Sequence, residues 1–257
     1  MNKIFWEKVK IKEKINFSAK IIGFCLATEN IAKNSKIGQF IHIKINEDKN
    51  LILRRPFSIA DIENNDILFI FRIVGKGTFL LSKLNKDDEL DILGPLGKPI
   101  EIPEEKDILI LGGGLGIAPL YFLSKILLEN KKNLFAIFGA KNSEELILKE
   151  KFEKLNLNRL IFYTEDGSYG KKGKVTDEIS QITKEKEFKI AYCAGPIEML
   201  RKIKLMLKEK IKIYGFLEER MGCGVGLCSV CAIPKNDGTY LHLCEDGPCL
   251  LLNEILL

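Results

Sequence analysis

The sequence predicts a multi-domain fold: an antiparallel β-barrel in residues 1–100, a doubly wound α/β domain with a parallel sheet in residues 101–212, and a small cysteine-rich domain in residues 213–257. Three observations support this. Short apolar runs separated by turn residues fill the first part. Strand and helix patterns alternate through the middle, and four closely spaced cysteines stand near the C-terminus.

The composition is ordinary for a folded chain, with 46% hydrophobic and 29% charged residues among 257. The net charge is +5 and no basic tract is interleaved with aromatic residues, so we expect no nucleic-acid partner. The first seven residues lack the apolar region of a signal peptide. The uncharged run 108–124 contains four glycines and Pro119, which favours a strand, turn and helix over a membrane span.

The predicted barrel is based on five apolar runs whose spacing is typical of a small antiparallel barrel or sandwich. Turn residues such as Asn30, Asn64-Asn65 and Gly94-Pro95 separate them. The runs are Phe17–Cys25, Phe40–Ile45, Ile52–Ala60, Ile67–Val74 and Glu89–Leu93.

Two stretches of this first part favour an anionic ligand. Arg54 and Arg55 lie in an apolar strand, where each needs an anionic partner or an exposed face, and a guanidinium group suits a pyrophosphate. Ser58 follows with a hydroxyl group. Gly77-Thr78 opens a helical pattern, an arrangement that offers free N–H groups, a hydroxyl and the helix dipole. Taken singly, an edge-strand arginine pair and a plain helix N-cap remain alternatives.

The middle of the chain alternates between buried strands and helices, which predicts the doubly wound domain. The predicted strands are 108–111, 134–138, 160–164 and 190–194, and the predicted helices are 120–129, 144–155 and 197–207.

A glycine-rich turn follows the first of these strands. Gly114 and Gly116 allow a pyrophosphate to approach the backbone closely, and the next helix N-terminus stabilises it. Pro119 stands where the dinucleotide fingerprint has its last glycine, so the pattern is G-x-G-x-x-P. No acidic residue ends the second strand, where Lys141 stands instead, so the choice between NAD and NADP remains open.

The cysteine-rich segment has the pattern C-x4-C-x2-C-x12-C, formed by Cys223, Cys228, Cys231 and Cys244. This is the ligand spacing of a plant-type [2Fe–2S] cluster. The neighbouring glycines permit left-handed backbone and let N–H groups approach the cluster. A four-cysteine zinc module used for protein contact is the non-enzyme alternative, although zinc sites usually show two short cysteine pairs.

Seven cysteines make an odd number, which favours a reducing cytoplasm over a disulfide framework. Cys25, Cys193 and Cys249 are left outside the motif. Cys244 ends the apolar run 240–243, so we expect a strand to carry it to the cluster. Cys249 follows the turn Gly247-Pro248, which should lead the chain away.

Arg-Pro-Phe-Ser, the later Gly-x-Gly-Thr and the G-x-G-x-x-P turn resemble the ferredoxin–NADP reductase superfamily. The resemblance implies that Arg55 and Gly77-Thr78 contact the phosphates of FAD and that Ser58 lies near its flavin ring. It also implies that Cys193 to Pro196 face the nicotinamide. The further residues implied for FAD are Pro56, Phe57, Ile70, Phe71 and Arg72, and those for NAD are Gly113, Gly114 and Gly116.

Over nearly its full length the chain resembles the electron-transfer subunits of class 1B, NAD-dependent dihydroorotate dehydrogenase. The shared motifs include Arg-Arg-Pro-Phe-Ser-Ile-Ala, Asp-Gly-Ser-Tyr-Gly and Glu-Glu-Arg-Met-Gly-Cys-Gly. The departures are small: Ile37 replaces a common proline, Pro99-Ile100 follow Gly-Pro-Leu-Gly, and Cys249 replaces a residue such as valine. In the wider ferredoxin–NADP reductase superfamily cysteine usually precedes Gly-Pro, where this chain has Ala194.

This resemblance implies a role in pyrimidine (UMP) biosynthesis. An FMN-containing catalytic subunit oxidises dihydroorotate, and the present chain passes the electrons through the [2Fe–2S] cluster and FAD to NAD⁺, in a heterotetramer of two copies of each subunit. No catalytic residue is expected in this chain, and we interpret His42 and His242 as structural. The alternative is a subunit of an NADH-dependent ferredoxin:NADP or sulfide oxidoreductase, although such relatives often replace one cluster cysteine with aspartate.

Overall fold

The structure is a computed structural model that describes residues 3–45, 51–207 and 211–257. The chain divides into two compact units. The first unit comprises residues 1–100, 218–233 and 241–248, and the second comprises residues 101–217, 234–240 and 249–257. The division into three domains at residues 100 and 212 stays a prediction.

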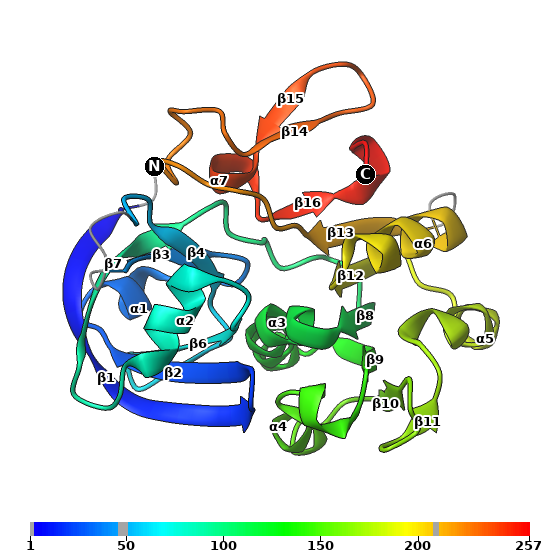
Figure 1. The fold of residues 1–257 in the computed structure, drawn as a ribbon. Coiled ribbons are helices and arrows are strands. Elements are labelled where there is room, and N and C mark those ends of the chain that lie inside the picture. Colours follow the sequence, from blue (N-terminus) through cyan, green and yellow to red (C-terminus); the bar gives the residue numbers. More distant parts are fainter. Residues whose placement is uncertain (1–2, 46–50, 208–210) are drawn as a thin grey trace. The chain divides into compact units, whose positions relative to one another are not determined.

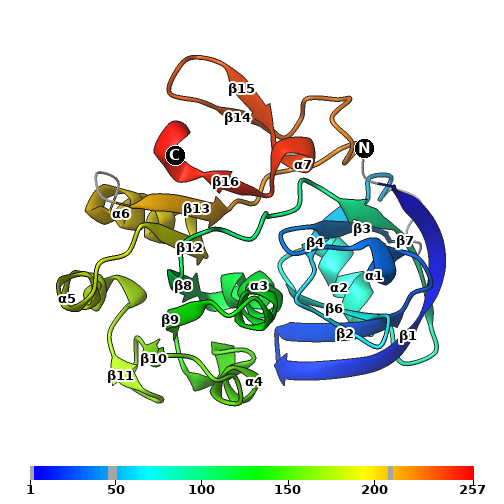
Figure 2. The same ribbon diagram turned by 180° about the vertical axis from the view of Figure 1, so that it is seen from behind.

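The first unit contains a seven-stranded antiparallel sheet in the order β4-β3-β7-β1-β2-β6-β5. The sheet curls into a barrel (Figure 2), because Phe57 on β4 packs against Phe69 and Phe71 on β6, with ring centroids 5.1 and 5.9 Å apart. Helices α1 (Ile31–Asn34) and α2 (Lys76–Lys83) lie between strands of this sheet in the chain order. The strands are β1 (Phe5–Ser18), β2 (Ile21–Ala27), β3 (Phe40–Lys44), β4 (Arg55–Ser58), β5 (Asp61–Glu63), β6 (Asp66–Arg72) and β7 (Glu89–Leu96).

The predicted run Phe17–Cys25 is not one strand, since it spans the end of β1 and most of β2. The turn between them consists of Ala19 and Lys20, which carry no turn signal. The prediction also missed most of β1. Its buried residues, such as Val9 and Ile11, alternate with exposed lysines and glutamates, so the strand has no continuous apolar run.

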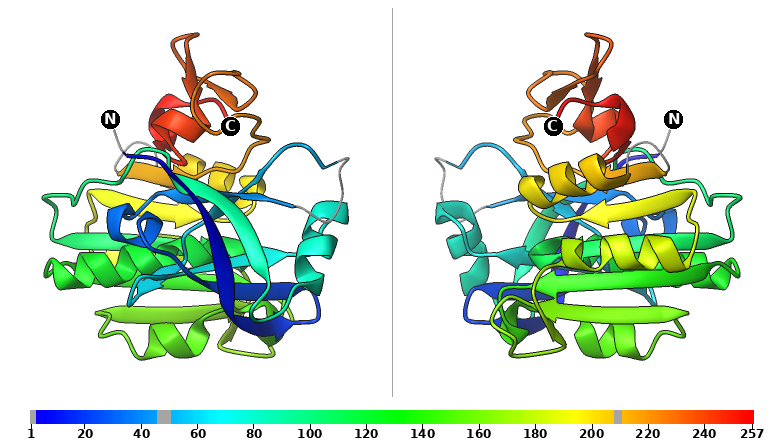
Figure 3. Two further views of the ribbon diagram at one scale, coloured as in Figure 1. Left: turned by 90° about the vertical axis from the view of Figure 1, so that its left-hand side faces the viewer. Right: turned by 90° about the vertical axis from the view of Figure 1, so that its right-hand side faces the viewer.

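The second unit contains a seven-stranded sheet in the order β11-β10-β9-β8-β12-β13-β16, in which only β16 runs antiparallel. Helices α3 (Ile117–Glu129) and α4 (Lys149–Glu153) cover one face, and α5 (Ile179–Glu185) and α6 (Ile197–Leu207) cover the other (Figures 1 and 3). The predicted fold class is confirmed. The strands are β8 (Asp107–Gly113), β9 (Asn133–Ala140), β10 (Arg159–Thr164), β11 (Lys171–Lys172), β12 (Ile190–Ala194), β13 (Lys212–Phe216) and β16 (Cys249–Leu251).

The helix predicted over 144–155 is wrong in its first half. The structure has a 3-10 turn at Ser143–Glu145 and α4 begins only at Lys149. The intervening residues Leu146, Ile147 and Leu148 are all buried. Leu148 adopts a left-handed backbone with a φ of 59°, which interrupts helical geometry directly before α4.

The cysteine-rich segment contains a two-stranded ribbon, β14 (Ala232–Pro234) and β15 (Tyr240–His242), followed by the short helix α7 (Leu243–Asp246). Cys244 therefore lies in a helical turn and not at the end of a strand, which corrects the prediction. The Asp246 carboxylate accepts a hydrogen bond from the backbone N–H of His242 at 2.7 Å, and this closes the turn.

None of the helices in the described parts of the chain combines the length and apolar character needed to cross a bilayer.

Candidate functional site

The two adjacent arginines of the first unit have different partners. Arg54 forms an ion pair with Asp91 at 2.6 Å and donates a second hydrogen bond to the Asp91 carbonyl at 3.0 Å. The indole N–H of Trp6 donates to the same carboxylate at 2.7 Å. Arg54 thus has its anionic partner within the chain, and its role is to neutralise a buried aspartate.

Arg55 lies over the N-terminus of helix α2. A Cβ atom built on Gly77 would stand 3.0 Å from the Arg55 Nε, so the glycine lets the guanidinium group approach the helix backbone. Arg55 also donates to the Leu53 carbonyl. Within the described ranges no carboxylate is in ion-pair range of Arg55. Its charge and the N–H groups of the first helical turn together suit a phosphate group.

Thr78 forms hydrogen bonds with the backbone at the N-terminus of α2. Its hydroxyl accepts hydrogen bonds from the backbone N–H groups of Val74 at 2.9 Å and Gly75 at 3.2 Å, and donates to the Gly75 carbonyl at 3.1 Å. The structure therefore brings together Arg55, Gly77 and Thr78, which the sequence predicts as phosphate contacts. Thr78 fixes the loop that leads into the helix.

The other residues predicted to bind FAD differ in how far their side chains are buried in the barrel. Ser58 ends β4 opposite Phe40 on β3, and Pro56 stands opposite His42. Phe57 and Phe71 belong to the aromatic packing of the barrel with Phe69. The Phe71 side chain already fills the core, so only its backbone is available to a ligand. Ile70 is buried and Arg72 half-buried at the end of β6.

The glycine-rich turn of the second unit stands at the topological switch point of the sheet. From β8 the chain proceeds through β9 to β10 on one side, and later returns to β12 and β13 on the other. The turn after β8 and the Gly195-Pro196 turn after β12 therefore flank the crevice at the carboxyl ends of the strands. Ligands of doubly wound sheets bind at such crevices.

The glycines of this turn have different surroundings. A Cβ atom on Gly114 would meet nothing within 4 Å, whereas one on Gly113 would stand 2.7 Å from the Met199 sulfur. A Cβ atom on Gly116 would collide with the backbone of Ala194 and Gly195. Gly116 thus permits close packing within the protein, and Gly114 borders open space that a ligand can use.

We expect Gly116→Ala to lower the free energy of unfolding by about 3 kcal/mol, because neither backbone segment can yield to the added methyl group. The matched control Gly114→Ala should cost only about 1 kcal/mol, from its φ of +55°, but should weaken NADH binding about tenfold. Urea unfolding and NADH titration measure the two effects. Equal losses of stability in both variants would contradict this distinction.

A hydrogen bond joins the loops after β9 and β10, which both lie at the carboxyl edge of the sheet. The Asp166 carboxylate accepts hydrogen bonds from the Ser168 N–H at 2.9 Å and hydroxyl at 2.7 Å, and the Ser168 oxygen accepts from the Ser143 N–H at 2.8 Å. These bonds hold the pKa of Asp166 below its usual range. This explains the Asp-Gly-Ser-Tyr-Gly motif as a fixed loop at the ligand edge.

A buried glutamate supports this loop from the sheet side. Glu178 accepts hydrogen bonds from Lys171 at 2.8 Å and from the Tyr163 hydroxyl, and pairs with Arg159 at 3.3 Å. Burial by itself raises the pKa of Glu178, but these partners outweigh it and hold the pKa below its usual range. No motif marks this residue in the sequence, because a lone glutamate before a helix is usually exposed.

All four motif cysteines lie in the first unit, Cys244 in α7 and the other three in the preceding loop, and several of their sulfurs accept N–H···S hydrogen bonds. Cys223 Sγ accepts from the N–H groups of Val225 at 3.4 Å and Leu227 at 3.2 Å, and Cys244 Sγ accepts from Gly226 at 3.1 Å. Burial raises the pKa of Cys223, but its hydrogen bonds with Val225, Cys228 and Leu227 outweigh it and lower the pKa to about 7. Hydrogen bonding thus stabilises the thiolate form of Cys223 relative to an ordinary thiol.

The thiols are grouped in two pairs. The Cys223 N–H donates to Cys228 Sγ and the Cys244 N–H donates to Cys231 Sγ, each at 3.4 Å. In the part of the chain that the structure describes, no three His, Cys, Asp or Glu side chains converge on a single metal position. A two-iron cluster takes two protein sulfurs on each iron, so two pairs fit it better than the single tetrahedron of a zinc site.

Comparisons with known proteins match this arrangement. A family model described as the iron-sulfur cluster binding domain of dihydroorotate dehydrogenase B matches residues 218–256, and one described as the oxidoreductase NAD-binding domain matches residues 110–204. The electron transfer subunit of dihydroorotate dehydrogenase B (NAD⁺) from Shouchella clausii (strain KSM-K16) is 37% identical over 240 residues, covering 90% of this chain and 91% of that protein. The subunit from Geobacillus thermodenitrificans (strain NG80-2) is 34% identical and covers 98% of each chain.

The chain belongs to this family of electron transfer subunits. It is an oxidoreductase subunit whose cofactors are FAD, a [2Fe–2S] cluster and NAD, as the sequence predicts. The residues that hold each cofactor stay predictions at this point.

Solved structures share the fold of the family. That of an NADH-dependent reduced ferredoxin–NADP oxidoreductase, determined in work on flavin-based electron bifurcation, has a TM-score of 0.89 and 30% identity, and the match covers 96% of this chain and 89% of that one. A ferredoxin NADP⁺ reductase from Neisseria gonorrhoeae has a TM-score of 0.70 at 19% identity and covers 82% and 98%. The second likeness concerns the fold alone.

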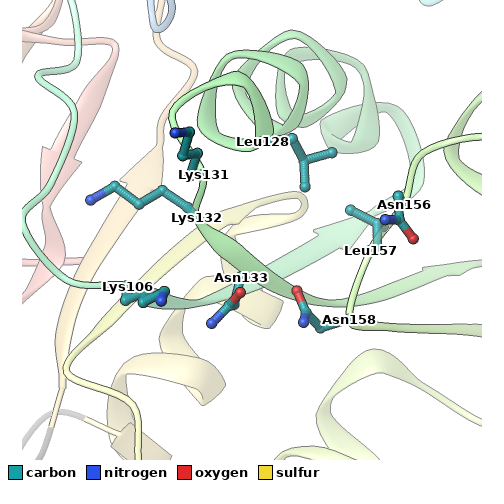
Figure 4. Close-up of a pocket in the computed structure, with 8 residues that line it drawn as sticks. All are labelled: Lys106, Leu128, Lys131, Lys132, Asn133, Asn156, Leu157 and Asn158. Atoms are coloured by element: carbon teal, nitrogen blue, oxygen red, sulfur yellow. The ribbon is translucent and has the colours of Figure 1, made fainter.

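A hollow of about 420 Å³ lies at the opposite edge of the parallel sheet from the glycine-rich turn (Figure 4). Lys106, Asn133 and Asn158 stand at or just before the amino ends of β8, β9 and β10. Ligands in such sheets bind at the carboxyl edge, and the Asn133 amide is already engaged by Asp107 at 2.8 Å. This hollow is therefore distinct from the cofactor sites of the family.

Proposed function

We propose that this subunit takes electrons from an FMN-containing dihydroorotate dehydrogenase subunit through a cluster held by Cys223, Cys228, Cys231 and Cys244, and delivers them from FAD to NAD⁺. When bound, the flavin converts one-electron transfer from iron into two-electron hydride transfer. The observation that carries the proposal is that the four thiols and the phosphate-binding arrangement of Arg55 and Gly77 belong to the same compact unit. Two redox groups held by one unit keep a fixed separation.

The proposed roles of the other residues follow from their placement. Arg55 and the helix α2 N-terminus bind the FAD pyrophosphate, and Ser58 at the end of β4 contacts the flavin. Gly114 and the α3 N-terminus receive the NAD pyrophosphate in the second unit. We propose that the oxidation of dihydroorotate occurs on the partner, which carries the FMN.

The exposed side of the cluster loop is the proposed entry point for electrons. Cys228 is exposed, and its neighbours Leu227 and Val230 are 84% and 55% exposed. Exposed aliphatic side chains beside a redox centre suit contact with another protein and exclude water from the transfer path. We propose that the catalytic subunit covers this edge, in an assembly of two copies of each subunit, and that the complex works in the cytoplasm. The odd number of cysteines, seven, supports the reducing compartment.

The isolated subunit should reduce an artificial acceptor with NADH but should not oxidise dihydroorotate. Addition of the FMN-containing subunit should restore dihydroorotate-dependent NADH formation, and the mass of the complex gives the stoichiometry. Dihydroorotate oxidation by this chain alone would refute the proposed division of labour.

A second candidate function has specific support, because the oxidoreductase structure with a TM-score of 0.89 is described as NADH-dependent and acts on reduced ferredoxin and NADP. A subunit of such an enzyme should exchange electrons with ferredoxin and work with a partner that uses NADP. Strong preference for reduced ferredoxin over the FMN-containing subunit would favour this candidate.

A further inference from the structure

His42 is fully buried, yet it has no hydrogen-bond partner among the residues that the structure describes. It lies on β3, between β4 and β7, and its side chain has no exposed surface. Within residues 3–45, 51–207 and 211–257, neither Nδ1 nor Nε2 has a hydrogen-bond partner. Burial, with a smaller contribution from the Arg54 charge, lowers the pKa of His42 to about 4. The imidazole is therefore neutral at pH 7, with one N–H donor and one acceptor nitrogen.

A buried polar group without a partner is costly, so this one requires an explanation. An unmade hydrogen bond in the interior costs on the order of 1–3 kcal/mol, and an unpaired buried group in a native protein is explained by strain, by a redox or catalytic role, or by a bound water, ion or cofactor. A leucine or phenylalanine would fill this position in the barrel without that cost. The imidazole therefore indicates a partner that belongs to the loaded protein.

The neighbours of His42 indicate which partner this is. A Cβ atom on Gly224 would stand 2.7 Å from both Nδ1 and Cε1, so this ring edge packs directly on the backbone that follows Cys223. Gly224 also has a φ of +75°, so the position requires glycine for two reasons. On the barrel side, Phe40 packs edge-on against the ring at 5.6 Å and Pro56 stands opposite on β4.

The cluster-binding loop is a place where N–H donors are needed. A reduced [2Fe–2S] cluster carries one more negative charge than the oxidised form, so each N–H donor to its sulfurs stabilises the reduced form more and raises the reduction potential. Val225, Gly226 and Leu227 supply backbone donors from within the loop. His42 is placed against the same loop from the barrel.

We propose that His42 donates its imidazole N–H to the sulfur face of the [2Fe–2S] cluster and thereby raises the cluster's reduction potential. The barrel that holds the flavin would then also adjust the potential of the centre that delivers electrons to it. His42 is a tuning residue and not a catalytic one. The inference rests on the cluster assignment proposed above.

The test is a redox titration of the cluster, followed by its paramagnetic resonance signal, in the full chain loaded with FAD and cluster. His42→Phe keeps an aromatic ring but removes the N–H, and it should lower the equilibrium constant for cluster reduction about tenfold, which is about 59 mV for one electron. His42→Asn places an amide N–H near the Nδ1 position and His42→Gln places one near Nε2. One of the two should recover most of the shift, which identifies the donating nitrogen.

Leu96→Ala is the matched control. The Leu96 side chain also contacts Gly224, at 3.2 Å from the position of an added Cβ atom, but it offers no donor. It should loosen the loop without moving the potential. An unchanged potential in His42→Phe, or a shift that appears in the flavin instead of the cluster, would overturn the proposal. A protein that binds no iron would instead refute the cluster assignment, so the two failures are distinguishable.

Discussion

We expect the Cys244→Ala variant to lose its iron, its labile sulfide and its paramagnetic signal, while FAD stays bound. This is the expected result because Cys244 supplies one of four sulfurs and is paired with Cys231, so its loss leaves one iron with a single protein ligand. The barrel strands that carry the FAD residues are formed without it. Metal analysis, the visible spectrum and flavin content measure the outcome. NADH should still reduce the bound flavin, but electron exchange with the partner should fail.

Cys249→Ala is the control for this prediction. Cys249 lies in β16, opposite Phe216, and belongs to the second unit and not to the unit that contains the four motif cysteines. Burial, together with the Cys193 thiol, raises the pKa of Cys249 well above its ordinary value, so it stays a neutral thiol. The cluster spectra should not change. Loss of the cluster in Cys249→Ala and its survival in Cys244→Ala would show that the fourth ligand is wrongly assigned.

Arg55→Ala should weaken FAD binding by about 3 kcal/mol, or about 150-fold in Kd, since a guanidinium group makes charge-assisted hydrogen bonds to a pyrophosphate. Arg55→Lys should recover part of this loss, because an ammonium group keeps the charge but not the fork of donors. Titration of the flavin-free protein with FAD, followed by flavin fluorescence, gives the dissociation constants. The free energy of unfolding of the flavin-free protein should change little.

Arg54→Ala is the matched comparison and should behave in the opposite way. It leaves the buried Asp91 carboxylate with only the Trp6 side-chain bond, so the free energy of unfolding should fall by about 2 kcal/mol. FAD affinity of the folded protein should be nearly unchanged. If Arg54→Ala abolished FAD binding and Arg55→Ala preserved it, the roles of the two arginines would be reversed.

The cofactors and the fold class can be predicted from the sequence, because each depends on residue types at a fixed spacing within a short segment. The cysteine pattern, the Gly-Thr step before a helix and the glycine-rich turn between strand and helix each describe one short loop, so they predict the cofactors without knowledge of the fold. Alternating strands and helices likewise predict the parallel sheet. Local patterns fail where tertiary packing sets the backbone, as at residues 146–148, where Leu148 adopts a φ of 59° and interrupts an expected helix.

Only the tertiary structure shows which residues of distant segments contact one another. The sequence does not distinguish the roles of Arg54 and Arg55. In the folded chain Asp91, 37 residues after Arg54, pairs with Arg54, whereas Arg55 lies beside Gly77 and is available to a ligand. His42 belongs to no sequence motif, and its proposed role depends on the fold, which packs Gly224 against its imidazole ring. A single sequence contains no record of such distant contacts, because the energies that fix them arise from burial and electrostatics between segments that meet only in the folded chain.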